Sequence, residues 1–403
     1  MLQVLTPEEV LNLIHDSFDV VSGGEAVDLA EACGRILADP VLSGSDEPPF
    51  NRSTVDGYAV KAADTFGAGA SLPAILNMTG EIKMGTLAAS PLPADSCMRI
   101  PTGGSVPEGA DAIVMQEYTE DFEDGTIGVT KPVSPGENMI FQGDDMRKGD
   151  VILPAGHLLS PKDTGALAAL GRCRVTVRKP LTAGILSTGD ELVPEWEEPG
   201  PGQIRDINSQ MLSSLCRSEG CLVRTYGIIR DDLNLITSAL KAAVAECDII
   251  ILSGGSSVGE KDNSVRAISQ LGEILFHGVA MKPGKPTMLG KALGKPVFGL
   301  PGHPQAAFFT ARLFVTSMID VLSGRIRERV HIPAVLSRSV SANDGRALYL
   351  PVSLDGEEGT LTATPLHGKS GLVSSLTRAQ GYICIPRNCE GISAGETVSV
   401  TLF

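Results

Sequence analysis

The sequence predicts a multidomain protein of the α/β plus β class, and three observations support this. The chain has 403 residues, more than one hydrophobic core usually supports, so two to four domains are expected. Between residues 175 and 327, apolar runs alternate regularly with helix-like stretches, which is typical of a doubly wound α/β domain. On either side of that region, short β-like runs alternate with turns rich in proline and glycine, which predicts β-rich domains.

Two segments before the α/β region carry helix signals. Residues 6–9 (Thr-Pro-Glu-Glu) supply a cap, a proline suited to the first helical position and a capping-box glutamate, for a helix that runs to about Val21. Residues 160–163 (Ser-Pro-Lys-Asp) start a second, shorter helix. We therefore expect residues 1–46 and 142–174 to pack together as one helical linker domain.

The segment between these two, residues 47–141, is predicted to be an inserted β-rich lobe. Within it an Asp-Gly pair lies between flanks of alternating apolar residues, which predicts a hairpin over Tyr118–Pro132. After the α/β domain, residues 175–327, the helical pattern stops. Residues 328–403 contain short strand-like runs and turns, so a C-terminal β-domain is expected.

The predicted strands of the α/β domain matter because an open parallel sheet binds ligands beyond the carboxyl ends of its strands. The apolar runs cover residues 181–186, 221–228, 248–252, 274–279 and 296–300, and the helix-like stretches cover 208–218, 232–246, 262–271 and 305–323. The loops that follow the apolar runs are therefore the first place to look for a binding site.

The composition limits the classes of function. The formal net charge is −15 and aromatic residues make up 4% of the chain, so we expect no nucleic-acid partner, because nucleic acids are bound by basic faces and stacking aromatic side chains. No apolar run approaches the roughly 20 residues that span a bilayer, and the N-terminus lacks the pattern of a secretory signal. We therefore expect no membrane contact and a cytoplasmic location. The eight cysteines form no Cys-x-x-Cys motif, so free thiols are expected rather than a zinc site.

Four loops at predicted strand ends share glycines, hydroxyl groups or charges. They contain Thr188, Gly189, Asp190 and Glu191; Ser253, Gly254, Gly255, Ser256 and Ser257; Lys282 and Lys285; and Pro301, Gly302 and His303. Glycines let the backbone approach an anion closely, and successive amides at a helix N-terminus can hold it. The alternatives are ordinary βα turns and solvated surface lysines, since neither a Walker A loop nor a dinucleotide-binding fingerprint is present.

Carboxylates accompany these loops, at Asp190, Glu191, Asp231, Asp232 and Asp262. Helix capping is the alternative interpretation for Asp231 and Asp262. Several acids beside a bound phosphate would repel it unless a divalent cation lay between them, and Mg²⁺ takes both carboxylate and phosphate oxygens as ligands. We therefore predict a Mg²⁺-assisted site for an anionic, phosphate-bearing ligand.

Together these segments resemble the MoeA family, the molybdopterin molybdenumtransferases. Seven motifs occur in order: Asp-Gly-Tyr-Ala at 56–59, Pro-Thr-Gly at 101–103, Gly-Asp-Asp at 143–145, Ser-Thr-Gly-Asp-Glu-Leu at 187–192, Ser-Gly-Gly-Ser-Ser-Val-Gly-Glu-Lys-Asp at 253–262, Lys-Pro-Gly-Lys-Pro at 282–286 and Gly-Leu-Pro-Gly-His-Pro at 299–304. The resemblance implies a homodimer that inserts molybdate into adenylated molybdopterin, with Mg²⁺ and with release of AMP. It also implies contacts with a molybdopterin adenylyltransferase and with apo-molybdoenzymes.

Carried onto this chain, the resemblance assigns catalytic roles to eight residues: Asp56, Thr102, Asp145, Glu191, Asp231, Asp262, Lys282 and Lys285. It implies that Glu191 and Asp262 bind Mg²⁺ and that both lysines bind oxyanion or pyrophosphate. Arg346 and Ser375 align with an oxyanion-contacting pair in the C-terminal domain. The remaining loop residues named above are implied to bind the substrate. Asp56 and Thr102 belong to the inserted lobe, so the resemblance implies that they complete the partner subunit's cleft.

The chain departs from the family at His303, where the family usually has Asn. An imidazole still donates and accepts hydrogen bonds, but it is bulkier than a carboxamide and titrates near neutral pH. The fine geometry or the pH optimum at this loop is therefore expected to differ.

Two rival interpretations remain. Molybdopterin adenylyltransferases use a similar α/β domain, but they lack the lobe at 47–141 and the C-terminal β-domain, and the Asp-Gly-Tyr motif at 56–58 also argues against them. A non-catalytic scaffold, comparable to the clustering role of gephyrin, is the second rival. The intact acidic loops and both lysines favour an enzyme over a scaffold.

Overall fold

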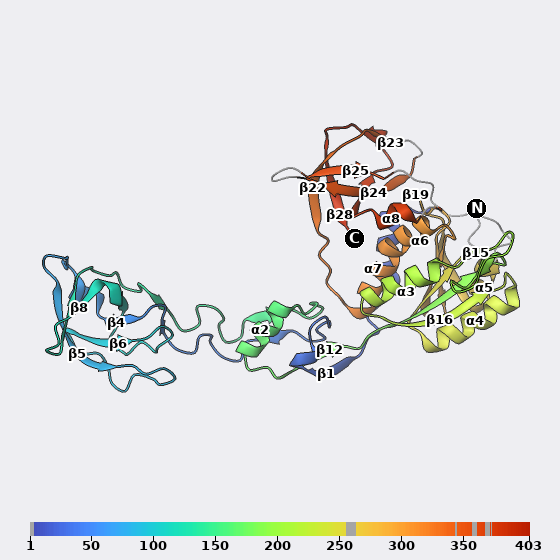
Figure 1. The fold of residues 1–403 in the computed structure, drawn as a ribbon. Helices are drawn as coiled ribbons and strands as arrows, with labels where there is room; N and C mark the ends of the chain where they lie inside the picture. Colours follow the sequence, from blue (N-terminus) through green and yellow to red (C-terminus); the bar gives the residue numbers. More distant parts are fainter. Residues whose placement is uncertain (1–3, 255–262, 343–344, 357–360, 367–370, 372) are drawn as a thin grey trace.

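Figure 1 shows an elongated chain with a β-rich lobe at one end, a small linking unit in the middle, and an α/β domain with a β-domain stacked on it at the other end. The chain runs out to the lobe and back through the linking unit, so the lobe is an insertion. This computed structural model describes residues 4–254, 263–342, 345–356, 361–366, 371 and 373–403.

The α/β domain is built on a six-stranded sheet in the order β16-β13-β17-β21-β20-β18. The first four strands in this order are parallel neighbours, and β20 runs antiparallel to both β21 and β18. The bounds are Thr182–Thr188 (β13), Leu222–Ile229 (β16), Ile249–Ser253 (β17), Gly272–His277 (β18), Met288–Ala292 (β20) and Lys295–Leu300 (β21). Each apolar run identified in the sequence corresponds to a strand, and β20 is an addition.

The strand β20 turns the expected parallel sheet into a mixed one. Leu293 and Gly294 form the two-residue connection from β20 to β21, with φ of 49° and 87°. Positive φ at both central residues is typical of a type I′ turn, whose twist matches that of antiparallel strands. A Leu-Gly pair is not the usual Asn-Gly or Asp-Gly signal, so this hairpin is not evident from the sequence.

Helices cover both faces of the sheet, as a doubly wound domain requires. Side chains of β17 alternate between the two faces. Ile249 and Ile251 share a core with α3, α6 and α7, whereas Ile250 and Leu252 share one with α4 and α5. The bounds are Asn208–Ser218 (α3), Leu233–Glu246 (α4), Asn263–Leu271 (α5), Pro304–Thr310 (α6), Ala311–Val315 (the π-helical turn η4) and Thr316–Ser323 (α7).

The continuous helical run from Pro304 to Ser323 is 20 residues long and apolar enough, by composition, to cross a membrane. This differs from the expectation that no run approaches that length. In its most apolar window, 78% of the residues are buried inside the protein, where the run packs against the sheet. It is therefore a core helix.

The first helix, α1 (Pro7–Ser17), begins as its sequence predicts. Thr6 Oγ1 accepts a hydrogen bond from the amide of Glu9 at 3.2 Å, and the carboxylate of Glu9 accepts from the amide of Thr6 at 2.7 Å. The helix ends earlier than the expected Val21, because Phe18 already has extended backbone angles.

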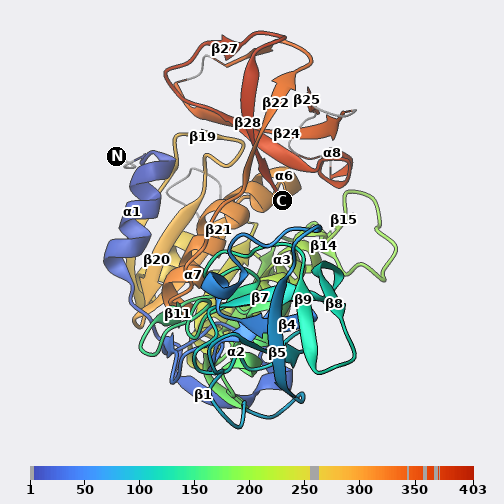
Figure 2. The same cartoon turned by 90° about the vertical axis from the view of Figure 1, so that its left-hand side faces the viewer.

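The packing of α1 corrects the expected domain division. Val10, Ile14 and Phe18 are buried in the same core as α7, and Figure 2 shows α1 along the outside of the α/β domain. The expectation that residues 1–46 pack as a whole with 142–174 is therefore wrong for α1, because its apolar stripe completes the core of the α/β domain.

The linking unit is formed by residues 24–42 and 151–178, which do lie together. It contains two small antiparallel sheets besides its short helices, so it is less helical than expected. Buried residues such as Leu37, Leu159 and Leu167 give it a core of its own. The bounds are Gly24–Asp28 (β1), Leu29–Glu31 (η1), Val41–Leu42 (β2), Val151–Leu153 (β11), Pro161–Ala169 (α2) and Arg174–Arg178 (β12).

The inserted lobe is built on a six-stranded sheet in the order β7-β4-β6-β5-β9-β8, with buried residues on both of its faces. The predicted hairpin is formed by β8 and β9, which pair antiparallel. The bounds are Gly57–Val60 (β4), Ala62–Thr65 (η2), Ala74–Glu81 (β5), Ser96–Ile100 (β6), Ala112–Met115 (β7), Gln116–Tyr118 (η3), Thr119–Asp121 (β8) and Thr126–Val129 (β9), with a pair at its base formed by Arg52–Ser53 (β3) and Met139–Ile140 (β10).

The C-terminal β-domain is a closed ring of strands in the order β24-β25-β22-β28-β26, because β26 also pairs with β24. The strand β19 (Met281–Lys282) of the preceding domain pairs parallel with the start of β24, so hydrogen bonds join the two domains. The bounds are His331–Leu336 (β22), Val340–Ser341 (β23), Ala347–Asp355 (β24), Thr362–Pro365 (β25), Ser374–Thr377 (α8), Gly381–Ile385 (β26), Gly391–Ile392 (β27) and Thr397–Leu402 (β28).

Candidate functional site

The carboxyl ends of β13 and β17 lie side by side in the middle of the α/β sheet. The chain leaves β13 through α3 for β16 on one side, and it leaves β17 through α5 for strands on the other side. A point where the connections diverge in this way is where open α/β sheets bind ligands. Thr188 and Ser253, both predicted from the sequence to bind the substrate, are the last residues of these two strands. We call this place the switch point.

Gly254 brings the loops of the switch point into direct contact. A Cβ atom at this position would lie 2.2 Å from the carbonyl oxygen of Thr188, and its φ is 94°, so glycine is required here. The Gly254 amide donates to the carbonyl oxygen of Leu300 at 3.2 Å. A Cβ added to Gly302 would lie 3.7 Å from the Cα of Gly254. Three of the four predicted loops therefore meet here.

Asn208, which is not among the site residues predicted from the sequence, holds two of these loops together. Its side-chain amide donates to Ser253 Oγ at 2.9 Å and to the carbonyl oxygen of Gly302 at 2.8 Å. The residue is the first of α3 and is 6% exposed. A polar residue at a helix start resembles a cap in the sequence, so only the folded chain distinguishes its role.

The interior of the switch point is polar. Ser187 and Thr188 are each 1% exposed. Among the residues that the structure describes, Ser187 Oγ, Thr188 Oγ1 and Asn208 Oδ1 are buried and have no hydrogen-bond partner. Buried polar atoms are normally paired, so this set of hydroxyl and carbonyl oxygens is suited to a polar ligand.

Carboxylates at the rim of the switch point come from neighbouring loops. Asp190 Oδ1 accepts from the amide of Asp231 at 3.3 Å, and Asn263 Nδ2 donates to Asp231 Oδ1 at 3.1 Å. A Cβ on Gly189 would lie 2.7 Å from Glu191 Oε2, so this carboxylate folds back over the end of β13. The structure thus brings together the predicted acids Asp190, Glu191 and Asp231.

Asp232, and not Asp231, caps the helix α4. Its carboxylate accepts from the amides of Asn234 at 2.9 Å and of Leu235 at 3.0 Å. The capping alternative considered for Asp231 is therefore wrong, and its side chain is held by Asn263 instead.

The predicted cationic residues lie where the α/β domain meets the C-terminal β-domain. The pairing of β19 with the start of β24 places Arg346, the residue before β24, beside the lysine loop. Lys282 and Lys285 are exposed. Between them, Gly284 packs so closely that a Cβ there would lie 2.5 Å from Thr310 Cγ2. The loop that carries the two lysines is therefore fixed against α6.

The fourth loop and the segment before α8 meet at the same junction. A Cβ on Gly371 would lie 3.8 Å from His303 Cδ2. His303 is exposed and precedes α6 without a side-chain capping bond. Ser375, predicted to contact an oxyanion, is the second residue of α8 and is 3% exposed, so its side chain is buried.

A cavity of about 860 Å³ opens beside the first loop, within the size range of small-molecule sites. Gly189 and Asp190 line it, and so do Trp196 and Arg230, which the sequence analysis did not select. Trp196 is the single tryptophan of the chain and is 80% exposed. Its segment runs from β14 (Leu192–Val193) to β15 (Ile204–Arg205). One aromatic side chain, that of Trp196, thus lines the cavity together with Asp190 of the carboxylate rim.

Three predicted site residues that precede the α/β domain, Asp56, Thr102 and Asp145, lie in the inserted lobe or near its base, away from the α/β domain of the same chain. Thr102 donates to Asp56 Oδ1 through its amide at 2.8 Å and through its hydroxyl at 3.2 Å, so these two residues form a pair. Asp145 is exposed near the base of the lobe, where its amide donates to the carbonyl oxygen of Glu47 at 3.1 Å. Figure 1 shows the lobe at the opposite end of the molecule from the α/β domain.

Four predicted site residues, Gly255, Ser256, Ser257 and Asp262, lie outside the described residues. Within the described part of the chain, no group of three or more His, Cys, Asp or Glu side chains is arranged to hold a metal ion. The carboxylates of Asp190, Glu191 and Asp231 are hard oxygen donors of the kind that Mg²⁺ prefers. The chemistry of the rim therefore fits Mg²⁺.

Comparisons with known proteins place the whole chain in one family. Residues 5–171 match the MoeA N-terminal region (domain I and II), residues 184–321 a probable molybdopterin binding domain, and residues 333–403 the MoeA C-terminal region (domain IV). A putative molybdopterin biosynthesis protein of Methanocaldococcus jannaschii is 37% identical over 94% of this chain and 92% of its own length. The chain belongs to the MoeA family.

Relatives with a named activity are similar over their full length. The molybdopterin molybdenumtransferase of Haemophilus influenzae is 32% identical over 99% of both chains, and that of Bacillus subtilis is 33% identical over 100% of this chain and 96% of its own. The crystal structure of the molybdopterin biosynthesis MoeA protein from Pyrococcus horikoshii covers 100% of both chains, with a TM-score of 0.87 and 34% identity. The multidomain arrangement described above is thus that of MoeA proteins.

Proposed function

We propose that this chain is a molybdopterin molybdenumtransferase, which inserts molybdate into adenylated molybdopterin and releases AMP. The observation that carries the proposal is the full-length match to relatives of that name. The switch point supports it, because a polar interior, a rim of carboxylates and a neighbouring cavity suit a large ligand that carries both phosphate groups and a polar ring.

In this proposal the residues of the switch point bind the pterin substrate. Thr188 and Ser253 offer hydroxyl groups at the ends of adjacent strands. The close contact at Gly254 keeps the loop backbone at the switch point free of side-chain bulk, so amides can approach phosphate oxygens. Gly255, Ser256 and Ser257 lie outside the described residues, and we retain them as proposed substrate-binding residues. Pro301, Gly302 and His303 would border the site.

The predicted cationic residues provide the positive charge that the second substrate, molybdate, requires. Molybdate is a dianion, and the protein as a whole carries a formal net charge of −15, so local positive groups must offset the overall repulsion. Lys282, Lys285 and Arg346 supply them at the domain junction, and Ser375 belongs to the C-terminal β-domain, as Arg346 does. We therefore assign molybdate to that side of the site.

We include Mg²⁺ as the cofactor, held by Glu191 and Asp262. When bound, it would neutralise phosphate charge beside the acidic rim. Asp190 follows β13 and Asp231 follows β16, and a hydrogen bond links the two residues. Together they would orient the substrate.

The proposal also includes a cytoplasmic homodimer. Asp56 and Thr102 are paired with each other at the far end of the chain from the switch point, so a second copy is needed to bring them to a cleft. Asp145 near the base of the lobe would belong to the same partner-supplied group. Contacts with a molybdopterin adenylyltransferase and with apo-molybdoenzymes would supply the substrate and consume the product.

The test is release of AMP from adenylated molybdopterin by the purified protein, with and without molybdate and Mg²⁺. We expect AMP and molybdenum cofactor only when both are present. Lys285→Ala should lose most of the activity, whereas Lys241→Ala, an exposed lysine on α4, should keep it. Formation of adenylated pterin from molybdopterin and ATP, without AMP release in the first assay, would instead identify an adenylyltransferase.

A further inference from the structure

A second cavity lies where the linking unit meets the α/β domain. Its volume is about 400 Å³. Leu181 and Cys221 line it, and these residues precede β13 and β16 at the amino ends of the strands. The switch point lies at the carboxyl ends, roughly 20 Å away along a strand of seven residues at about 3.3 Å per residue. This hinge cavity is therefore separate from the site described above.

The walls of the hinge cavity are strongly basic in an acidic protein. One carboxylate, that of Glu219, lines it, and five cationic residues do so: Arg35, Arg178, Lys179, Arg217 and Arg325. The formal net charge of the whole chain is −15, so this concentration of positive charge runs against the overall composition.

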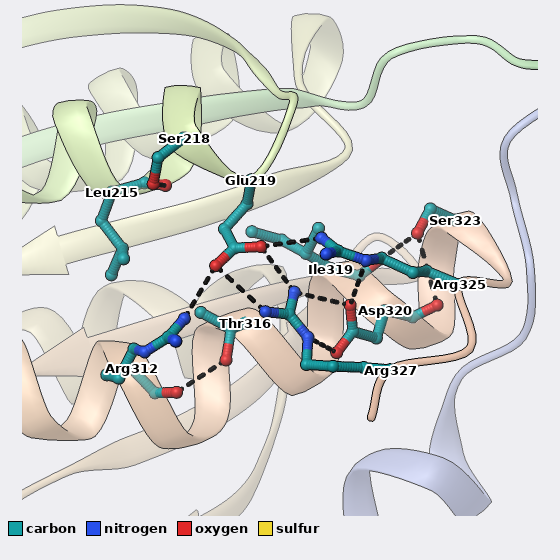
Figure 3. A network of polar contacts seen from close by, with 10 residues as sticks. All are labelled: Leu215, Ser218, Glu219, Arg312, Thr316, Ile319, Asp320, Ser323, Arg325 and Arg327. Carbon is teal, nitrogen blue, oxygen red and sulfur yellow. Dashed lines mark hydrogen bonds and ion pairs between the residues drawn. The ribbon is translucent and has the colours of Figure 1, made fainter. Parts of the chain in front are cut away.

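The one carboxylate that lines the hinge cavity, that of Glu219, already accepts hydrogen bonds from three arginine side chains. Figure 3 shows Glu219 enclosed by guanidinium groups. Its oxygens accept from Arg312 at 2.9 Å, from Arg325 at 2.9 Å, and from Arg327. Asp320, the nearest other acid, accepts from Arg327 at 2.6 Å. Within this network positive side chains outnumber carboxylates, so it does not neutralise further cations of the cavity.

Three of the cavity's cationic residues have no carboxylate partner within the part of the chain that the structure describes. They are Arg178, Lys179 and Arg217, whereas Arg35 is paired with Glu25. Arg178 Nη1 donates to the carbonyl oxygen of Ser22 at 2.9 Å, but its Nε is buried with no hydrogen-bond partner. A buried guanidinium donor without an acceptor is costly, and the positive charge of this side chain is not offset by a carboxylate among the described residues.

We propose that the hinge cavity binds a phosphate group, either as inorganic phosphate or as a small phosphate monoester. Arginine side chains match the geometry of phosphate oxygens and bind them with two hydrogen bonds at once. The lining also includes the apolar residues Ile36, Leu158 and Ile319, which would accept the organic part of a monoester. The available volume lies within the range of small-ligand sites.

Because the hinge cavity lies between the linking unit and the α/β domain, a bound ligand would affect the relative orientation of these two units. Ile36 and Leu158 belong to the linking unit, whereas Arg217 and Ile319 belong to the α/β domain. Residues 179–181 are the connection from β12 to β13. A ligand that touches both walls binds best at one relative orientation of the two units, so it shifts the population toward that orientation. The occupant thus sets the direction in which the inserted lobe points.

The test is isothermal titration calorimetry of the full-length protein with inorganic phosphate and, separately, with AMP. Both titrations use a Lys282→Ala, Lys285→Ala background, which removes two cations of the domain junction. Any binding at the loops of the switch point is common to the hinge variant and its control, so the comparison of the two isolates the hinge cavity. Lys179→Gln with Arg217→Gln removes two exposed charges of the hinge cavity. The matched control is Lys241→Gln with Arg338→Gln, which removes two exposed charges elsewhere on the chain.

We expect the hinge variant to bind phosphate at least 10-fold more weakly than the background protein, and the control to bind it unchanged. Tighter binding of AMP than of phosphate, lost in the hinge variant, would identify a monoester as the ligand.

Small-angle scattering should show a phosphate-dependent change in the radius of gyration that the hinge variant lacks. Equal binding by hinge variant and control, or no binding at all, would overturn the proposal. If the double substitution prevents folding, the two single substitutions serve the same comparison. This result is independent of AMP release at the switch point, so either proposal can fail alone.

Discussion

At the scale of single residues, Asn208 determines how the loops of the switch point are held. It is buried, and it joins Ser253 to the backbone of Gly302 with two hydrogen bonds. These two hydrogen bonds set the position of Ser253 Oγ relative to the loop of Gly302.

We predict that Asn208→Ala lowers kcat by about 10-fold to 100-fold, because small misplacements of positioning groups have effects of that order. Loss of two buried hydrogen bonds should also lower the free energy of unfolding by about 1–3 kcal/mol. Steady-state AMP release and urea unfolding measure the two effects. The control is Asn234→Ala, an exposed asparagine on α4. Unchanged kcat in Asn208→Ala would show that the loops are held by other means.

His303→Asn is predicted to keep activity within a fewfold at neutral pH. His303 is exposed beside the segment of Gly371, and a carboxamide still donates and accepts hydrogen bonds as a neutral imidazole does. The pH profile of kcat is the informative measurement, because Asn does not titrate. Near-total loss of activity would show that the imidazole has a role of its own.

Much of the site could be predicted residue by residue, because its chemistry is local to the loops. Asp190, Glu191 and Asp231 were chosen for following strands, and the structure brings them together. Asn208 could not be chosen in this way, since its partners are 45 and 94 positions away in sequence. The contact of Asp56 with Thr102 is likewise visible only in the folded lobe.

At the scale of elements, the pattern of apolar residues correctly predicted strands and helices where their packing is local. The strands and helices of the α/β domain follow it, and so does the hairpin of the lobe. It failed for β20, where a Leu-Gly turn gives no hairpin signal. It also failed to show where α1 packs, because an amphipathic helix fits any apolar surface of suitable shape, and sequence order does not say which.

The contact of the β13 and β17 loops gives a prediction at this scale. Gly254→Ala should destabilise the protein by more than about 1 kcal/mol, because a Cβ here meets the Thr188 carbonyl oxygen at a φ that L residues rarely adopt. The rate of AMP release should fall by more than the loss of stability alone would cause, because the added Cβ pushes the loops after β13 and β17 apart. Gly165→Ala in α2 is the matched control, for its Cβ meets nothing within 4 Å. It should be neutral or stabilising by up to roughly 1 kcal/mol. Thermal unfolding and AMP release compare the two variants, and equal effects would contradict the prediction.

At the scale of the whole molecule, the network around Glu219 stabilises the junction of α3, α7 and the segment that leads to the C-terminal domain (Figure 3). Glu219→Gln should lower the free energy of unfolding by roughly 3–5 kcal/mol at neutral pH, the usual cost of removing one partner of a buried ion pair. Glu246→Gln, which breaks an exposed pair with Arg224, should cost less than about 1 kcal/mol.

The pH dependence of this network has a definite sign. Burial acts to raise the pKa of Glu219, but the hydrogen bond and charge of Arg327, together with the charges of Arg325 and Arg312, outweigh burial and lower the pKa below its ordinary value of 4.5. A carboxylate with a lowered folded pKa contributes stability that is complete above the unfolded pKa and is lost as pH falls through the folded one. Urea unfolding from pH 7 to pH 3 should therefore show that the stability difference between the wild type and Glu219→Gln becomes smaller toward the acid end. A constant difference across this range would contradict the assignment.

The elongated shape leads to a prediction about how two copies share their sites. Asp56 and Thr102 belong to the inserted lobe, which lies at the opposite end of the molecule from the α/β domain. In the proposed dimer a lobe therefore serves the switch point of its partner. Asp56→Asn and Lys285→Ala should each be nearly inactive alone. Co-expressed with two different affinity tags, they should form mixed dimers in which one of the two sites is complete. A randomly assembled mixture should then recover about a quarter of the wild-type activity, because half of the dimers are mixed and each has one working site of two. If each lobe served its own chain, every site of the mixed dimer would carry one defect, and the mixture would remain as inactive as either variant.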